Sequence, residues 1–178
     1  GAAGMYGDGV YPPSQLGASG MAFEAGVRGK NLTEWQFGMA SLNPRWNVSG
    51  SYMQVLPTFI STAPDGSDPR EFLAEHYASR GEMLGAVFLK GYQWPFDVNK
   101  TGGGSSVIDL LVYRETILRG RRVWLDFRVN AGGEEIPFHC LPEEARTYLE
   151  KAGALFGTPV ERLARINAPA ISFYRDHG

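Results

Sequence analysis

The pattern of hydrophobic and polar positions predicts a chain with more helix than strand. Apolar residues recur at helical spacing over residues 14–26 and 82–90. The strongest helical pattern covers residues 105–119, directly after three consecutive glycines. We expect its apolar stripe to be buried: Val107, Ile108, Leu111, Val112, Ile117 and Leu118. Gly120 is placed to end this helix.

Proline-containing start signals predict three more helices. They begin at Asp68-Pro69, at Leu141-Pro142 and at Thr158-Pro159, since proline fits the first turn of a helix. The predicted helix after Pro69 would carry its apolar and aromatic residues on one face: Phe72, Leu73, His76 and Tyr77.

Residues that favour extended structure predict strands over 33–42, 51–61 and 123–127, the second interrupted at Pro57. Residues 1–13 are rich in Gly and Pro and predict a loop. The expected fold class is therefore α+β: a helix-rich domain with a small β-sheet.

Composition narrows the range of partners. A chain of 178 residues corresponds to one domain, and 17 basic against 19 acidic residues give a net charge of −2 without a basic run, which argues against nucleic acid. No apolar run is long enough to span a bilayer. The single cysteine, Cys140, excludes an internal disulfide and is compatible with the reducing cytoplasm, the location we expect.

Local motifs for metals or nucleotides are missing from the sequence. The three histidines are scattered, so we expect no metal site. Gly7-Asp8-Gly9 lacks the third glycine and the preceding strand of a dinucleotide-binding motif. Cys140 lies in an apolar segment, where a lone cysteine is typically a small core residue.

Two sets of residues carry a resemblance to a known family. The run Met21-Ala22-Phe23-Glu24-Ala25-Gly26, with Gln36-Phe37 ten residues after the glycine, resembles the flavoprotein subunits of the fumarate reductase and succinate dehydrogenase superfamily, which includes L-aspartate oxidase. There, a helix ending in Ala-Gly leads to a Gln-Phe-His-Pro-Thr segment at the substrate. Arg114-Glu115, Gly120 and Val123-Trp124-Leu125-Asp126 are similar to a second series in that superfamily.

The resemblance implies an FAD-dependent oxidoreductase that passes a hydride between the flavin and an organic substrate. In this family a capping domain is inserted into the FAD-binding domain. We therefore expect residues 1–30 to be a linker and helix of, or adjoining, the FAD-binding domain, and residues 31–178 to be the capping domain of a longer flavoprotein. The FAD-binding domain of the same polypeptide would be the partner. FAD would be held by the full-length parent, and this chain alone would be inactive.

The resemblance also assigns candidate site residues. At three positions the chain departs from the family: Gly38 stands in place of its His, Ala40 in place of its Thr, and Ser105 in place of its proton-donating Arg. Fumarate and succinate are therefore not the expected substrates, and a larger or less charged molecule fits better. The substrate-binding candidates are Gly38, Ser41, Arg45, Trp46 and Ser105. Arg45 can bind an acidic group or form a surface salt bridge, and Ser105 can cap the 105–119 helix. The cofactor-binding candidates are Ser14, Gln15 and Gly17, although Ser14 and Gln15 also suit a helix start.

An alternative function belongs to a different class: a non-catalytic module whose aromatic surface recognises a partner domain or peptide. Under the flavoprotein hypothesis, Gly1 and Gly178 should lie near one another. An apolar patch that includes Met5, Tyr6, Tyr11, Leu16 and Trp46 should also be exposed.

Overall fold

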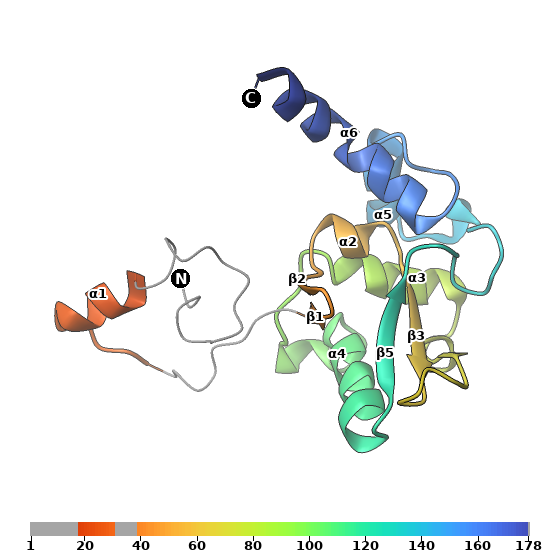
Figure 1. The fold of residues 1–178 in the computed structure, drawn as a ribbon. Helices are drawn as coiled ribbons and strands as arrows, with labels where there is room; N and C mark the ends of the chain where they lie inside the picture. The colour runs from red at the N-terminus through yellow and green to blue at the C-terminus, as the bar shows by residue number, and fades with distance from the viewer. Residues whose placement is uncertain (1–17, 31–38, 178) are drawn as a thin grey trace.

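A computed structural model describes residues 18–30 and 39–177. Within them the fold is α+β and helix-rich, as predicted (Figure 1). Two predictions concern residues that lie outside the described part of the chain. They are the proximity of Gly1 and Gly178 and the exposure of Met5, Tyr6, Tyr11 and Leu16.

A small antiparallel sheet has the order β4-β3-β5. The central strand β3 (Thr58–Thr62) pairs along its whole length with β5 (Arg122–Asp126) and at two positions with β4 (Arg70–Glu71). Four of the five β3 residues are buried, as suits a central strand covered on both faces. A second sheet is the hairpin of β1 (Ala40–Leu42) and β2 (Arg45–Asn47).

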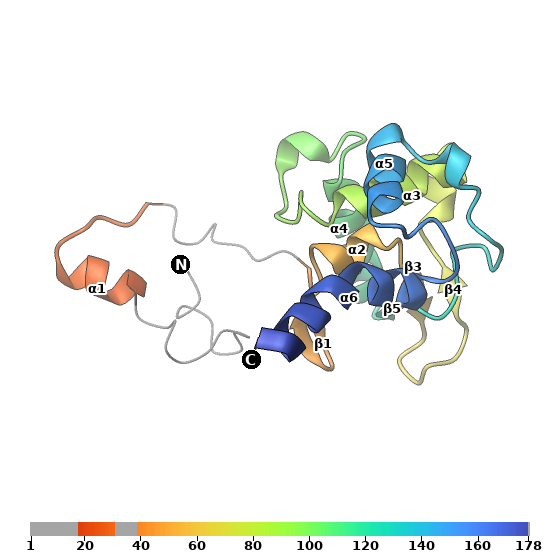
Figure 2. The same ribbon diagram turned by 90° about the horizontal axis from the view of Figure 1, so that it is seen from above.

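Helices surround the sheet, and their ends follow the start and stop signals in the sequence. Ser79 caps the start of α3 (Arg80–Leu89): its hydroxyl accepts from the Glu82 N–H at 3.2 Å, and the Glu82 carboxylate accepts from the N–H of Ala78, the residue before the cap, at 3.0 Å. The other described helices are α1 (Ala18–Glu24), α2 (Ser51–Gln54), α4 (Ser106–Tyr113), α5 (Glu143–Lys151) and α6 (Pro159–His177). In Figures 1 and 2, α1 stands apart from the other elements, and the C-terminal half of α6 extends away from the body.

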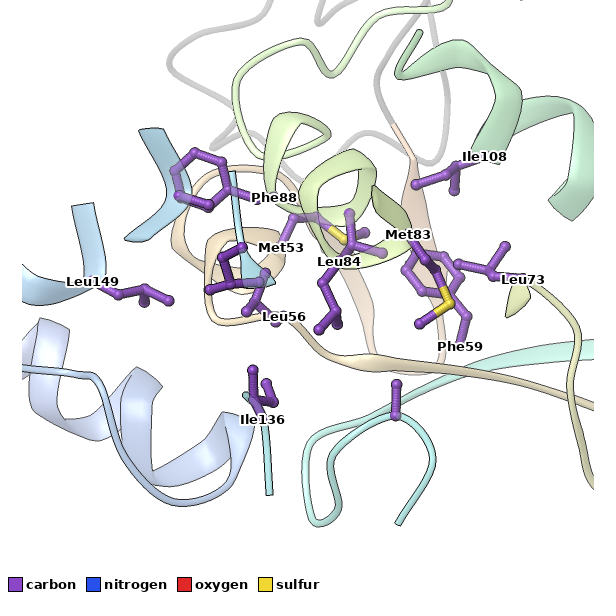
Figure 3. Close-up of a cluster of buried hydrophobic side chains, with 14 of the residues drawn as sticks. Met53, Leu56, Phe59, Leu73, Met83, Leu84, Phe88, Ile108, Ile136 and Leu149 are labelled. Carbon is purple, nitrogen blue, oxygen red and sulfur yellow. The ribbon is translucent and has the colours of Figure 1, made fainter. Parts of the chain in front are cut away.

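One core joins α2, β3, α3, α4 and α5 (Figure 3). It contains Met53, Leu56, Phe59, Leu84, Phe88, Ile108 and Leu149, each at most 3% exposed. Two glycines of α3 let the segment before α5 approach closely: a Cβ on Gly81 would lie 2.1 Å from the Cys140 carbonyl oxygen, and one on Gly85 would lie 2.5 Å from Pro142 Cγ.

Two predicted elements are wrong. The segment after Asp68-Pro69 forms β4 and a 3-10 turn (Ala74–His76) in place of a helix, because Asp68 has a positive φ of 53° and residues 70–71 pair with β3. The predicted strand over 51–61 begins as helix α2 and becomes a strand only after Pro57. The predicted strand over 33–42 is confirmed at Ala40–Leu42; Met39 precedes the strand, and residues 33–38 lie outside the described residues.

The predicted 105–119 helix forms, but its last turn changes type. After α4 the chain continues as a π-helix over Arg114–Leu118. The wider turn shifts the apolar stripe by one position, so Ile117 and Leu118, which we expected to be buried, are exposed. Gly120 ends the helix with a φ of 64°, as predicted.

The described residues form no helix that is both long and apolar enough to cross a membrane.

Candidate functional site

The hairpin of β1 and β2 contains three of the predicted substrate-binding residues. Ser41 and Trp46 are cross-strand partners, and Arg45 pairs with Leu42 beside the turn. The Ser41 hydroxyl donates to the Pro44 carbonyl at 2.5 Å, and Trp46 is half-exposed. The hairpin therefore brings Ser41 and Trp46 together at the surface; the side chain of Arg45, like Gly38, lies outside what the structure describes, as do Ser14, Gln15 and Gly17.

Ser105 is separate from this surface because it is fully buried. Its hydroxyl donates to the side-chain oxygen of Gln93 at 3.1 Å and makes no cap bond to α4, so the prediction that Ser105 caps the helix is wrong. The next hydroxyl, that of Ser106, accepts from the Asp97 N–H at 2.9 Å. The loop between α3 and α4 thus folds over the start of α4 and binds both hydroxyls.

A buried ion pair holds the same loop. Lys90 is 1% exposed, and its Nζ lies 2.5 Å from the Asp109 carboxylate and 3.3 Å from the Gln93 carbonyl oxygen. Burial raises the pKa of Asp109, and the bond from Lys90 opposes that rise. The Lys90 ammonium group is buried and bonds to Asp109 and to the Gln93 carbonyl oxygen, so its role is structural.

The Arg114-Glu115 pair belongs to a second buried network. Glu115 is 2% exposed, accepts from the Ser61 hydroxyl at 2.7 Å and forms an ion pair with Arg119 at 2.7 Å. Arg121 also donates to the Ser61 hydroxyl, at 2.6 Å. These contacts attach the π-helical turn to β3, so Glu115 links α4 to the sheet.

A cavity of about 310 Å³ lies beside the start of α3. We call it the Tyr77–Arg80 pocket, with a wall formed by Glu71, Tyr77, Ser79, Arg80, Met83 and Gly132 among others. These residues come from β4, from α3 and the segment that leads into it, and from the loop after β5. Its volume is at the lower end of the range of about 300–1,000 Å³ that is typical of small-molecule sites.

Two residues of the pocket wall each contain a polar atom that is buried without a hydrogen-bond partner: the Tyr77 hydroxyl and Arg80 Nε. The two terminal nitrogens of Arg80 donate to the carbonyl oxygens of Glu134 and Glu135, at 2.9 and 3.3 Å. Burial, aided by the Glu82 charge, raises the pKa of Tyr77 to about 12, so its hydroxyl keeps its proton at neutral pH. Both atoms are shielded from solvent, and therefore from the open cavity as well.

The charges of the pocket are one cation and one anion. Both oxygens of Glu71 accept from the Gly132 N–H at 2.9 Å, and the Gly132 backbone lies against the Arg80 guanidinium. Arg80 has no ion-pair partner among the described residues. The Arg80 guanidinium is thus held by backbone carbonyls, and the one carboxylate in the pocket wall is that of Glu71.

Within the described residues, no group of histidine, cysteine or acidic side chains could hold a metal ion. Cys140 is exposed, so the prediction that it is a core residue is wrong. Its backbone carbonyl, rather than its thiol, packs on Gly81.

Comparisons with protein-family models, with curated proteins and with solved structures found no match for this chain.

One local motif is a partial signal for the pocket, and our site prediction did not use it. Ser79-Arg80-Gly81-Glu82 has the spacing of a capping box, which predicts a helix start with Arg80 in its first turn. The contacts between Arg80 and the loop after β5 span more than fifty residues and leave no local pattern.

Proposed function

We propose that this chain is the substrate-side capping domain of an FAD-dependent oxidoreductase, which passes a hydride between a flavin and an organic substrate other than fumarate or succinate. The observation that carries the proposal is helix α1, whose end and whose exposed apolar side chains both fit the sequence resemblance. The FAD would be bound by a further domain of the same polypeptide.

The end of α1 supports this proposal. Gly26 has a φ of 84°, its N–H donates to the Phe23 carbonyl, and the Val27 N–H donates to the Ala22 carbonyl. This is a Schellman motif, which needs a residue such as glycine just after the helix. A helix that ends at an Ala-Gly pair is the element that comes before the substrate segment in the family.

The side chains of α1 support it in a second way. Met21, Phe23 and Val27 are 67%, 40% and 57% exposed, and a seven-residue helix is too short to be stable in water without packing. The helix therefore requires another surface. The resemblance identifies that surface as the FAD-binding domain.

The later motif agrees with the same proposal. Arg114-Glu115 lies on a helix, Gly120 ends it, and strand β5 follows, which is the order of elements that the family series implies. Substrate choice follows from the residues at the family's reactive positions, Gly38, Ala40 and Ser105. Ser105 is buried and bound to Gln93, so it offers no proton donor to a dicarboxylate.

The proposal is tested on the polypeptide that the natural gene encodes. It should purify with flavin absorbance at about 450 nm and release FAD on denaturation. In that enzyme, Arg45→Ala should lower kcat/KM about ten- to a hundredfold if this cation orients the substrate. Arg165→Ala, which alters an exposed arginine of α6, is the matched control. A colourless full-length protein would refute the flavoprotein assignment.

A second function, a non-catalytic interaction module, is favoured by one observation. Leu110, Tyr113 and Ile117 are exposed at helical spacing on α4 and its π-helical extension, and Trp124 of the adjacent strand β5 is also exposed. Such a stripe suits a protein partner. A colourless gene product that binds another protein, with binding lost in Tyr113→Ala, would support this alternative.

A further inference from the structure

One edge of the sheet has backbone groups without a partner strand. Strand β5 is paired with β3 on one side only, since the strand order is β4-β3-β5. None of its five residues is buried, and Trp124 at its centre is 46% exposed. Within the described part of the chain, no backbone hydrogen bond other than those with β3 reaches residues 122–126. The outward N–H and C=O groups of β5 are therefore available to a further strand.

The residues of β5 are complementary to a second copy of themselves. In an antiparallel pair centred on Trp124, Arg122 of one copy faces Asp126 of the other at both ends. Between these ends, Val123 faces Leu125, and the two tryptophans face each other. Pairs of opposite charge, of aliphatic residues and of aromatic residues all stabilise neighbouring strands. Moving the register by one residue in either direction would place a charged residue opposite an apolar one, so the pair centred on Trp124 is favoured.

We propose that β5 is a dimerisation edge, at which two copies of this chain pair antiparallel about a two-fold axis at Trp124. The two three-stranded sheets would then form one continuous sheet, and both copies would use the same surface. The opposite edge is less suitable, because β4 has only two residues. This inference stands whether or not the chain serves a flavoprotein, and it assigns a second copy of the chain as the partner of the exposed Trp124.

The charged residues at the two ends of β5 are able to pair between copies. The Arg122 side chain is exposed and makes no hydrogen bond or ion pair with another described residue. Asp126 accepts hydrogen bonds from Arg128, but its Oδ2 accepts only one of them, and a carboxylate oxygen has room for a second donor. The Arg128 side chain is 86% exposed, so it leaves space for Arg122 of the second copy.

Exposed apolar side chains extend the surface beyond the strand. Ile117 and Leu118 are exposed on the π-helical turn before β5, and Val129 is exposed after β5. Because the paired strands would run in opposite directions, the turn of one copy would lie towards Val129 of the other. A pair of five-residue strands is small beside the area of about 1,200–2,000 Å² in stable interfaces. We therefore expect a weak, reversible dimer.

Sedimentation equilibrium of the 178-residue chain tests for this dimer. The mean mass should rise from 19.5 kDa towards twice that value as the protein concentration is raised about a hundredfold into the high micromolar range. A mass that stays at 19.5 kDa throughout would overturn the proposal.

Charge exchange assigns the contact to β5. Arg122→Asp should weaken the dimer at least about tenfold, because it places two acidic residues opposite each other at both ends of the pair. The double variant Arg122→Asp with Asp126→Arg restores opposite charges and should restore the dimer. Arg165→Asp makes the same change in net charge at an exposed position of α6 and should have no effect. A dimer that Arg122→Asp leaves unchanged would form through another surface, and the proposal would be wrong.

Disulfide trapping tests the register independently. Residues directly opposite in antiparallel strands have Cα atoms about 4.5–5.5 Å apart, within the range of a disulfide. With Cys140 replaced by serine, Trp124→Cys should form a cross-linked dimer in oxidised glutathione. Val123→Cys should cross-link more slowly, because its opposite residue is Leu125, and Arg165→Cys measures random collision. If Trp124→Cys cross-links no faster than Arg165→Cys, the pair centred on Trp124 does not exist, even where the charge-exchanged variant fails to fold.

Discussion

Substituting Gly81 by alanine separates two opposing effects in one helix. In an ordinary helix, alanine is more favourable than glycine by about 1 kcal/mol. At Gly81, however, the new Cβ would lie 2.1 Å from the Cys140 carbonyl oxygen and 3.0 Å from its carbonyl carbon. Ordinary contact begins at 3.4 Å, so the two segments would have to separate by more than an ångström.

The clash should outweigh the helix propensity. Overpacking a core costs about 1–3 kcal/mol, and the cost is at the upper end where the contact is backbone rather than a flexible side chain. We therefore expect Gly81→Ala to lower the free energy of unfolding by about 1–2 kcal/mol net, and the Tm by about 2–8 °C.

Urea denaturation followed by circular dichroism measures the effect. Gly85→Ala should cost less, because its Cβ would meet the Pro142 ring at 2.5 Å rather than a backbone carbonyl. Gly102→Ala is the matched control: no atom lies within 4 Å of its added Cβ, and its φ is not positive, so stability should be unchanged or slightly raised. A Gly81→Ala variant as stable as the parent would refute the close packing of α3 on the segment before α5.

The elements that the sequence predicted well are those with strong local signals. The helices α3, α4, α5 and α6 begin near the predicted positions because capping residues and apolar periodicity act within one or two turns. Strand β5 was predicted from consecutive residues that favour extended structure. The fold class followed from these elements together.

The errors occur where distant contacts override local preference. Asp68-Pro69 is a reasonable helix start, but pairing of β4 with β3 and the ion pair between Asp68 and Arg121 hold the segment in another conformation. Ser105 is a reasonable helix cap, but Gln93 provides its hydroxyl with a different acceptor. A single sequence does not reveal which distant residue will compete with a local bond.

The candidate sites also differ in whether their residues are near or far apart in the sequence. The hairpin that unites Ser41 and Trp46 joins residues close in sequence, so two of the candidate residues lie side by side, although the pairing itself was not predicted. The Tyr77–Arg80 pocket is assembled from three separate parts of the chain. Its cation is held by carbonyls of the loop after β5, and neither Tyr77 nor Arg80 was among the predicted site residues.

Three further substitutions test buried and titrating groups. Arg162→Met should lower the free energy of unfolding by about 3–5 kcal/mol, because the fully buried guanidinium donates to four acceptors. The control, Arg165→Met at an exposed position, should have little effect. Burial raises the pKa of Tyr77 to about 12, so Tyr77→Phe should remove one tyrosine that ionises late in an ultraviolet titration. The unfolded chain ionises this tyrosine from about pH 10 and the folded chain only near pH 12, so its contribution to the free energy of unfolding is present below pH 10 and is lost as the pH rises above it. The last test concerns acid. Hydrogen bonds from Arg128 lower the pKa of Asp126 from its ordinary value of 3.8, so the folded state holds fewer protons than the unfolded state just below that pH. Asp126 therefore contributes stability above pH 3.8 that is lost as the pH falls through its folded pKa. In urea titrations between pH 5 and pH 2, Asp126→Asn should flatten the loss of stability relative to the parent chain. An unchanged slope would show that Arg128 does not stabilise the Asp126 carboxylate in the folded state.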